Sequence, residues 1–203
     1  MNILPFRHVE SRSRPMLALT SADGAAIALV QGRVHEICGP ARRSLAAMLA
    51  QLTAGPVIWA HPGWSREALC PAGLAPLLDP ARLILAACPA ALDLLWTAEE
   101  ALRSGAVGAV VAELGEPPGL TPLRRLQLAA EAGGGRATGF LLTPGEGGAP
   151  GVESRWHAAP RPGGGWHLRR LRARMAPVAA FDLPPPPAGM AHKSRHPARA
   201  PAP

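Results

Sequence analysis

The stretch DPARLILAACPAALDLLWTAEEALRSGAVGAVVAEL, residues 79–114, decides the fold class. Its apolar runs at 82–88 and 107–113 have the length and composition of buried strands. Between them, residues 90–104 show helical spacing of apolar side chains, and Gly105 is placed to end this helix in a left-handed conformation. The inward face of the helix is predicted to carry Leu92, Leu95, Trp96 and Leu102. A strand, a helix and a strand with short links indicate a right-handed crossover in a parallel sheet.

The same alternation continues towards the N-terminus. Residues 33–38 and 56–60 are apolar runs typical of strands. The segment between them has apolar residues at positions i, i+3, i+4 and i+7, which places them on one face of a helix. These residues are Leu45, Met48, Leu49 and Leu52.

Towards the C-terminus, TPLRRLQLAAEAGG predicts a further helix, with Thr121 as its N-cap and Pro122 at the first helical position. A fifth apolar run at 137–143 predicts another strand. We therefore expect an α/β fold, in which a mainly parallel sheet is covered by helices on both faces.

The two ends of the chain have a different pattern. Residues 1–31 form an N-terminal extension that either adds an edge strand or stays partly loose. Residues 152–160 and 166–175, separated by an RPGGG turn, predict an antiparallel strand pair at the sheet edge. Residues 183–203 are Pro-rich and basic, which is typical of a disordered tail. The α/β domain is thus expected to span 32–182.

The positive charge is concentrated near the C-terminus. The chain of 203 residues has a formal net charge of +7. Residues 1–151 contain 12 basic and 12 acidic residues, whereas residues 152–203 contain 9 basic residues against Glu153 and Asp182. This asymmetry favours a polyanion or an acidic partner at that end of the protein.

The cysteines and histidines do not form a metal-binding or disulfide pattern. Cys38, Cys70 and Cys88 are far apart and odd in number, so we expect buried, inert thiols. The seven histidines form no i, i+4 pair on a helix, and we predict neither a metal nor a cofactor. No run of about 18 apolar residues is present, so a cytoplasmic location without membrane contact is expected.

The stretch VHEICGPARRSLAAML, residues 34–49, is a strand, a turn and a helix, the setting of a phosphate-binding loop. Gly39 and Pro40 keep the turn of the motif G-x-x-x-x-G-K-[ST]. Aligned on Gly39, however, the second glycine is replaced by Ser44, the lysine by Leu45 and the hydroxyl residue by Ala46. Leucine cannot neutralise phosphate and alanine cannot ligate Mg²⁺, so we predict that the protein is not an enzyme.

Two alternatives remain for the helix that follows this turn. Its N-terminus, with Arg42 and Arg43, either binds an anion weakly or is an ordinary connection with two solvated arginines. Glu113 ends a predicted strand where an ATPase would have a metal-binding acid, and without a lysine opposite it is interpreted as structural or vestigial.

A basic cluster near the C-terminus is the second candidate site. On a strand, Arg170, Arg172 and Arg174 point to one side, with Arg169 beside them and Arg155 on the preceding strand. This stripe either contacts DNA phosphates or a partner, or it protects an edge strand from aggregation. Trp156 and Trp166 on the same strands are either core residues or stacking platforms for bases.

Three segments, GRVHEICGP, residues 79–114 and LTPLRRLQLAAEAGG, together resemble the RecA superfamily and in particular the ImuA family. The resemblance covers residues 33–142, and AEEALRSGAVGAVVAEL is its most specific part. WHLRRLRARMAPVAAFDL is similar to the final basic strand pair of the family, with a looser match. The resemblance implies a RecA-like core with a degenerate Walker A loop.

The resemblance also implies a function. ImuA proteins are accessory factors of DNA-damage-induced translesion synthesis (SOS mutagenesis), which act with an ImuB-like protein and an error-prone DnaE-type polymerase. Because this sequence departs from the recombinases at Ser44, Leu45 and Ala46, recombinase and ATPase activity are not implied. The alternative is a SulA-like inhibitor of cell division that acts by protein binding.

Overall fold

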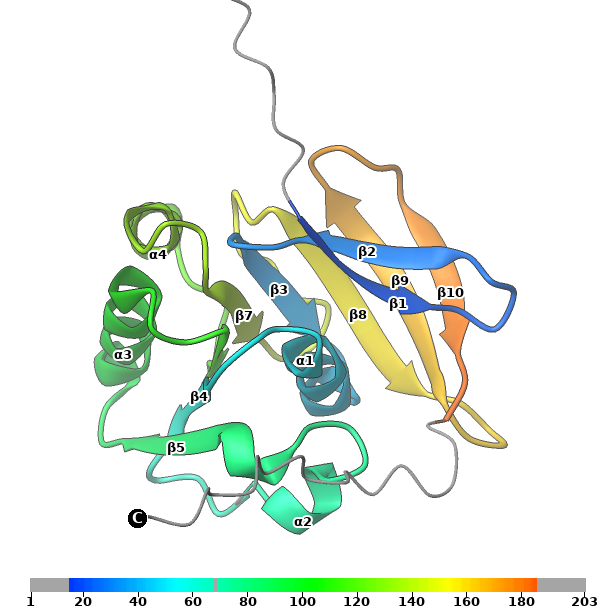
Figure 1. Cartoon of the computed structure of the whole chain (residues 1–203), viewed down its shortest axis with the longest axis horizontal. Coiled ribbons are helices and arrows are strands. Elements are labelled where there is room, and N and C mark those ends of the chain that lie inside the picture. The colour runs from blue at the N-terminus through cyan, green and yellow to red at the C-terminus, as the bar shows by residue number, and fades with distance from the viewer. Residues whose placement is uncertain (1–14, 68, 186–203) are drawn as a thin grey trace, which may run out of the picture.

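A central sheet of eight strands runs through the molecule (Figure 1). The computed structural model describes residues 15–67 and 69–185. The strand order is β10-β9-β8-β3-β7-β6-β4-β5. The strands are β3 (Val34–Cys38), β4 (Val57–Pro62), β5 (Leu83–Cys88), β6 (Ala109–Glu113), β7 (Thr138–Leu142), β8 (Ser154–Pro160), β9 (Trp166–Ala173) and β10 (Ala179–Leu183). All neighbours from β5 to β8 pair in parallel, and β9 and β10 add antiparallel pairs.

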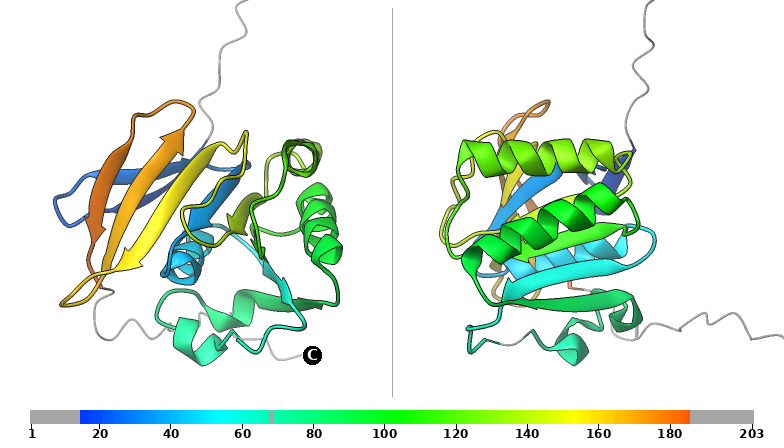
Figure 2. Two further views of the ribbon diagram at one scale, coloured as in Figure 1. Left: turned by 180° about the vertical axis from the view of Figure 1, so that it is seen from behind. Right: turned by 90° about the vertical axis from the view of Figure 1, so that its left-hand side faces the viewer.

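Helices cover both faces of this sheet (Figure 2). The helical elements are α1 (Arg42–Gln51), α2 (Pro71–Leu74), a 3-10 turn η1 (Pro80–Arg82), α3 (Ala91–Ser104) and α4 (Leu120–Ala132). On one face α1 packs on a core that includes Trp59, Phe140 and Trp156. On the other face α3 and α4 pack on a core that includes Val110 and Leu141. The predicted α/β fold with a mostly parallel sheet is therefore confirmed, as is the antiparallel pairing of residues 154–160 with 166–173.

Gly105 ends α3 in the left-handed conformation predicted from the sequence, with φ of 60°. A Cβ at this position would lie 2.6 Å from the carbonyl oxygen of Gly133, which follows α4. The two glycines therefore allow the C-terminal ends of α3 and α4 to approach each other at the backbone.

The prediction for the inward face of α3 was wrong at two positions. Leu92 and Trp96 are 75% and 60% exposed. The residues that face the sheet are Leu94, Ala98, Ala101 and Leu102, at i, i+4, i+7 and i+8. The alanines let the helix lie close to the sheet, whereas Leu92 and Trp96, each two residues before a buried position, point outward.

The start of α4 also differs from the prediction. Gly119, and not Thr121, is the N-cap, so Thr121 and Pro122 both lie in the first turn. Proline is tolerated at this place because the N–H groups of the first turn have no partner within the helix.

The chain ends add two features that the sequence did not predict. β1 (Met16–Thr20) and β2 (Ala26–Val30) form a separate antiparallel hairpin and add no edge strand to the main sheet. Leu17, Ile27 and Leu29 bury this hairpin against the core of α1. β10 is a third antiparallel strand, where only a pair was expected. The disordered tail predicted for residues 183–203 begins too early, because Leu183 is the buried last residue of β10. Its part beyond residue 185 lies outside the described residues, as do residues 1–14.

A buried histidine joins the hairpin to the main sheet. His35 on β3 has Nε2 at 2.8 Å from the Val30 carbonyl and Nδ1 at 2.7 Å from Ser154 Oγ. The Trp156 indole N–H also donates to Ser154 Oγ, over 2.9 Å. This pattern fits a neutral imidazole whose Nε2–H donates to Val30 and whose Nδ1 accepts from the Ser154 hydroxyl. Burial lowers the pKa of His35 from 6.5 to about 4.

Acid should weaken the domain through this residue. Because the pKa is 6.5 in the unfolded chain and about 4 in the fold, the unfolded chain takes up the proton first as the pH falls. The stabilisation is complete above pH 6.5 and is lost as the pH falls to about 4, on the order of 3 kcal/mol in all.

The measurement is urea unfolding between pH 6.5 and about 5, above the range where most carboxylates titrate. The free energy of unfolding should fall more steeply in the unmodified protein than in His35→Gln, whose side chain does not titrate. Equal slopes in the two proteins would contradict a neutral, buried His35.

Candidate functional site

The turn after β3 has no room for a phosphate group. Gly39 has φ of 87°, and a Cβ there would lie 2.5 Å from the Ala158 carbonyl oxygen and 2.7 Å from His157 Nε2. The Ala41 N–H, which in a phosphate-binding loop would face the ligand, donates to Ala158 over 2.9 Å. The backbone of β8 therefore fills the concave side of the turn.

The residues that replace the motif contribute to the core. Leu45 and Ala46 are fully buried on the face of α1 that packs on the sheet, whereas Ser44 is half-buried. Arg42 folds back on the turn and donates to the Gly39 carbonyl over 3.2 Å. Leu45 therefore packs α1 on the core, at the position where the phosphate-binding motif has its lysine.

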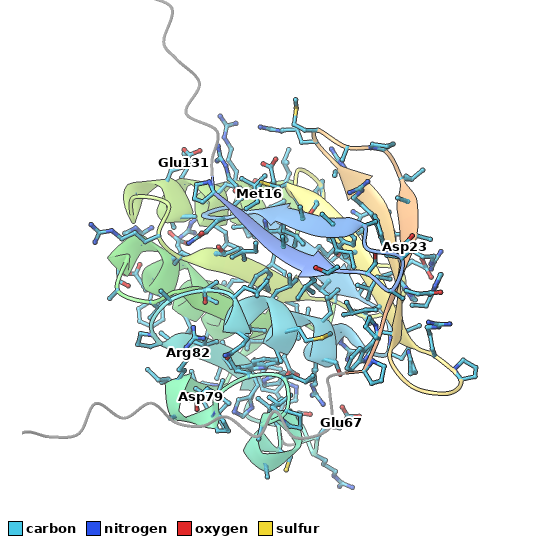
Figure 3. All side chains as sticks on the ribbon, turned by 45° about the vertical axis from the view of Figure 1, so that its right-hand side comes forward. Met16, Asp23, Glu67, Asp79, Arg82 and Glu131 are labelled. Carbon is cyan, nitrogen blue, oxygen red and sulfur yellow. The ribbon has the colours of Figure 1, made fainter. Side chains whose placement is uncertain are left out.

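Glu113, at the place where an ATPase would have a metal-binding acid, is held by an arginine. Arg43 of α1 makes a two-pronged pair with Glu113 at the end of β6, with Nε to Oε1 at 2.9 Å and Nη2 to Oε2 at 2.7 Å. The indole N–H of Trp59 donates to Oε1 over 2.8 Å. Glu67, labelled in Figure 3, lies 3.3 Å from Arg43 Nη1. The hydrogen bond with Glu113 raises the pKa of Arg43.

This geometry gives Arg43 and Glu113 a structural role. Both carboxylate oxygens of Glu113 are engaged, and the guanidinium supplies the charge that a metal ion would bring. Arg43 is therefore not a solvated arginine, whereas weak anion binding at the N-terminus of α1 stays a prediction. The pair of Arg43 with Glu113 is a long-range contact between α1 and β6, which no local pattern contains.

A second buried carboxylate was missed by the sequence analysis. Glu36 on β3 is completely buried and accepts hydrogen bonds from Thr143 Oγ1 and the backbone N–H groups of Gly148 and Ala149, at 2.8 to 3.0 Å. Arg155 on β8 donates Nε to Glu36 over 2.5 Å and Nη2 to the Ala149 carbonyl over 2.9 Å. The available signal was an acid inside the apolar run VHEIC. Arg155 is therefore part of a structural clamp.

The predicted stripe of three arginines does not exist. β8 and β9 pair with a register shift, in which Arg155 lies opposite Arg172 but Trp156 lies opposite Arg170. Leu171 is the extra residue of this bulge, so Arg170 and Arg172 lie on opposite faces of the sheet. The prediction assumed a regular strand, in which residues two apart share a face.

Two more of the five arginines have partners within the protein, Arg170 at a buried tryptophan and Arg169 in an exposed ion pair. The Arg170 guanidinium lies 5.5 Å from the ring centre of Trp156, which is buried as a core residue, and donates to the Pro177 carbonyl over 2.7 Å. Arg169 donates to both carboxylate oxygens of Glu146, at 2.7 and 2.8 Å. Within residues 15–67 and 69–185, only Arg172 and Arg174 of this cluster have side chains without a hydrogen bond or ion pair.

The thiols differ in their exposure. Cys38 and Cys88 are buried, and burial raises the pKa of Cys38 to about 12. Cys70 is exposed, so the expectation of three buried thiols was wrong at this position. No three His, Cys, Asp or Glu side chains within the described ranges lie close enough to hold a metal ion. Among the helices described, none is long and apolar enough to cross a membrane.

Comparison with known proteins identifies no family. No protein-family model matches the chain, and no curated protein sequence matches it at a significant level. Membership of the ImuA family therefore stays a prediction from the sequence.

The ion pair between Arg43 and Glu113 should stabilise the fold. Arg43→Met leaves the nearly buried Glu113 carboxylate with the Trp59 indole but without a counter-charge. Breaking a buried pair costs about 3–5 kcal/mol, and partial exposure of Arg43 reduces the expected loss to about 2 kcal/mol.

Chemical denaturation measures this loss, with Arg136→Met as the matched control, because Arg136 is exposed and its side chain has no partner in the described residues. The double variant Arg43→Met with Glu113→Gln should recover part of the loss, because it no longer leaves a charge unpaired. If Arg43→Met and Arg136→Met had equal effects, the pair would not contribute to stability.

Proposed function

We propose that the chain is a non-catalytic, RecA-like accessory factor in DNA-damage-induced translesion synthesis. It acts in the cytoplasm with an ImuB-like protein and an error-prone DnaE-type polymerase. The observation that carries the non-catalytic part is the turn at Gly39, which the Ala158 carbonyl and His157 fill. The partners rest on the resemblance of residues 33–142 alone.

The contacts of the turn support the proposal that the protein does not change conformation with a bound nucleotide. In a nucleotide-dependent protein, the phosphates and their metal hold the turn, the helix and the acid of the neighbouring strand together. Here three internal contacts have this role: Ala41 with Ala158, Arg42 with Gly39, and Arg43 with Glu113. The position of α1 is therefore fixed in one state, and surfaces for partners are permanently displayed.

A direct contact with DNA would be limited to two of the predicted arginines. Arg155 is held by the buried Glu36, Arg170 by Trp156 and Pro177, and Arg169 by an exposed ion pair with Glu146. Within the described residues, Arg172 and Arg174 are the arginines of this cluster whose side chains have no partner, so this role requires them. Two phosphate contacts give weak, salt-sensitive binding. The proposal therefore assigns recognition of the damaged template to the partners.

Co-purification tests the proposal. The full chain, expressed with an ImuB-like protein and a DnaE-type polymerase of the same organism, should join them in a complex that gel filtration and mass photometry detect. The complex should be the same with and without Mg·ATP. A complex that forms equally well without this chain would refute the assignment.

The alternative of a SulA-like inhibitor gives a different result in cells. Overexpression of an accessory factor of translesion synthesis should leave cell length unchanged. Filamentous cells with a normal mutation frequency after damage would favour inhibition of cell division and contradict the proposal.

A further inference from the structure

A groove with an apolar floor and basic sides lies between α4 and the end of β9. It encloses about 330 Å³. The residues on which the argument depends are Arg33, Leu120, Arg124, Leu128, Glu153 and Arg174. Leu120 and Leu128 are 61% and 56% exposed although both are large and apolar. The groove is distinct from the turn at Gly39 and was not predicted from the sequence.

The apolar residues follow one line along α4. Leu120, Arg124 and Leu128 are spaced by four residues, so they share a face of the helix. The rise per residue places the two leucines about 12 Å apart. Gly151 lies on the other side, where a Cβ would be only 3.4 Å from Leu120 Cδ1, so the absence of a side chain keeps this end of the groove open.

The charges of the groove are not balanced. Arg33 pairs with Glu131, labelled in Figure 3, and its Nε lies 3.9 Å from Glu153, so one arginine serves both groove carboxylates. Arg124 and Arg174 are exposed and have no acidic partner in the described part of the chain. Arg174 is held in place by its backbone N–H, which donates to the Glu153 carbonyl over 3.1 Å. Two unpaired guanidiniums therefore line the groove, and that of Arg124 lies between the two leucines along α4.

We propose that this groove binds an acidic amphipathic helix of a partner protein. Carboxylates on that helix would pair with Arg124 and Arg174, and apolar residues at i and i+4 or i+7 would cover Leu120 and Leu128. Three turns are enough to span the two leucines. The inference does not depend on the translesion assignment, because it follows from the groove alone.

Two other occupants fit less well. Among the described residues, the groove lining has no aromatic side chain on which a nucleic acid base could stack, and phosphates would leave both leucines uncovered. A second copy of the chain would have to offer an acidic helix. Two acids of α3, the buried Glu99 and the exposed Glu100, are already held by Arg103 and Arg125.

The test uses the full chain and a display library of helical peptides of about 18 residues, long enough to be helical. Selected peptides should carry an apolar stripe flanked by Asp or Glu. The tightest of them should bind with a Kd in the micromolar range, as expected for a small interface. Reversing its acidic residues to Lys should abolish binding.

Charge-reversal variants locate the site. Arg124→Glu and Arg174→Glu should each weaken binding of the acidic peptide about tenfold or more. Arg136→Glu is the matched control, because Arg136 is an exposed arginine outside the groove. Circular dichroism checks that each variant is folded. Displacement of the bound peptide by a poly-dT oligonucleotide tests for binding of nucleic acid. The mass of the free protein in solution tests for binding of a second copy of the chain.

Several outcomes would overturn the inference. These are selected peptides without acidic residues, equal effects of Arg124→Glu and Arg136→Glu, displacement of the peptide by the oligonucleotide, or a dimer that dissociates in Arg124→Glu.

Discussion

The close approach of β8 to the turn at Gly39 is the constraint on which the rest of the structure depends. The Ala158 carbonyl lies where any side chain at position 39 would have its Cβ, and it accepts the Ala41 N–H at the start of α1. Only glycine fits here, because the turn needs a positive φ and the space is already occupied. This contact fixes the direction in which α1 leaves β3, and thereby the core of Trp59, Phe140 and Trp156 beneath it.

Electrostatics at the same end of the sheet are balanced without a ligand. Glu113 and Glu36 are both buried carboxylates at or near the ends of parallel strands, and each is paired with an arginine from a neighbouring element. An unpaired buried carboxylate would cost several kcal/mol, so the arginines Arg43 and Arg155 are needed for the fold to be stable in the absence of a cation. Arginines that suggest phosphate or DNA binding in the sequence thus neutralise buried carboxylates of the same chain.

The sequence predicted the parts of this structure that depend on local pattern. The β-strand and α-helix alternation, the left-handed Gly105 and the loss of the lysine and hydroxyl at Leu45 and Ala46 are all visible in short windows. The orientation of Trp96, the bulge at Leu171 and the pair of Arg43 with Glu113 were not predictable in this way. Each depends on a contact between separate segments of the chain. The alanines of α3 pack against the sheet, β8 pairs with β9, and α1 contacts β6.

Calorimetric titration of the full chain with Mg·ATP tests the central claim most directly, because that claim is that internal contacts occupy the place of the nucleotide. The filled turn and the engaged Glu113 predict no binding heat, with a Kd weaker than about 1 mM. Saturable, Mg²⁺-dependent binding tighter than about 100 μM would contradict it.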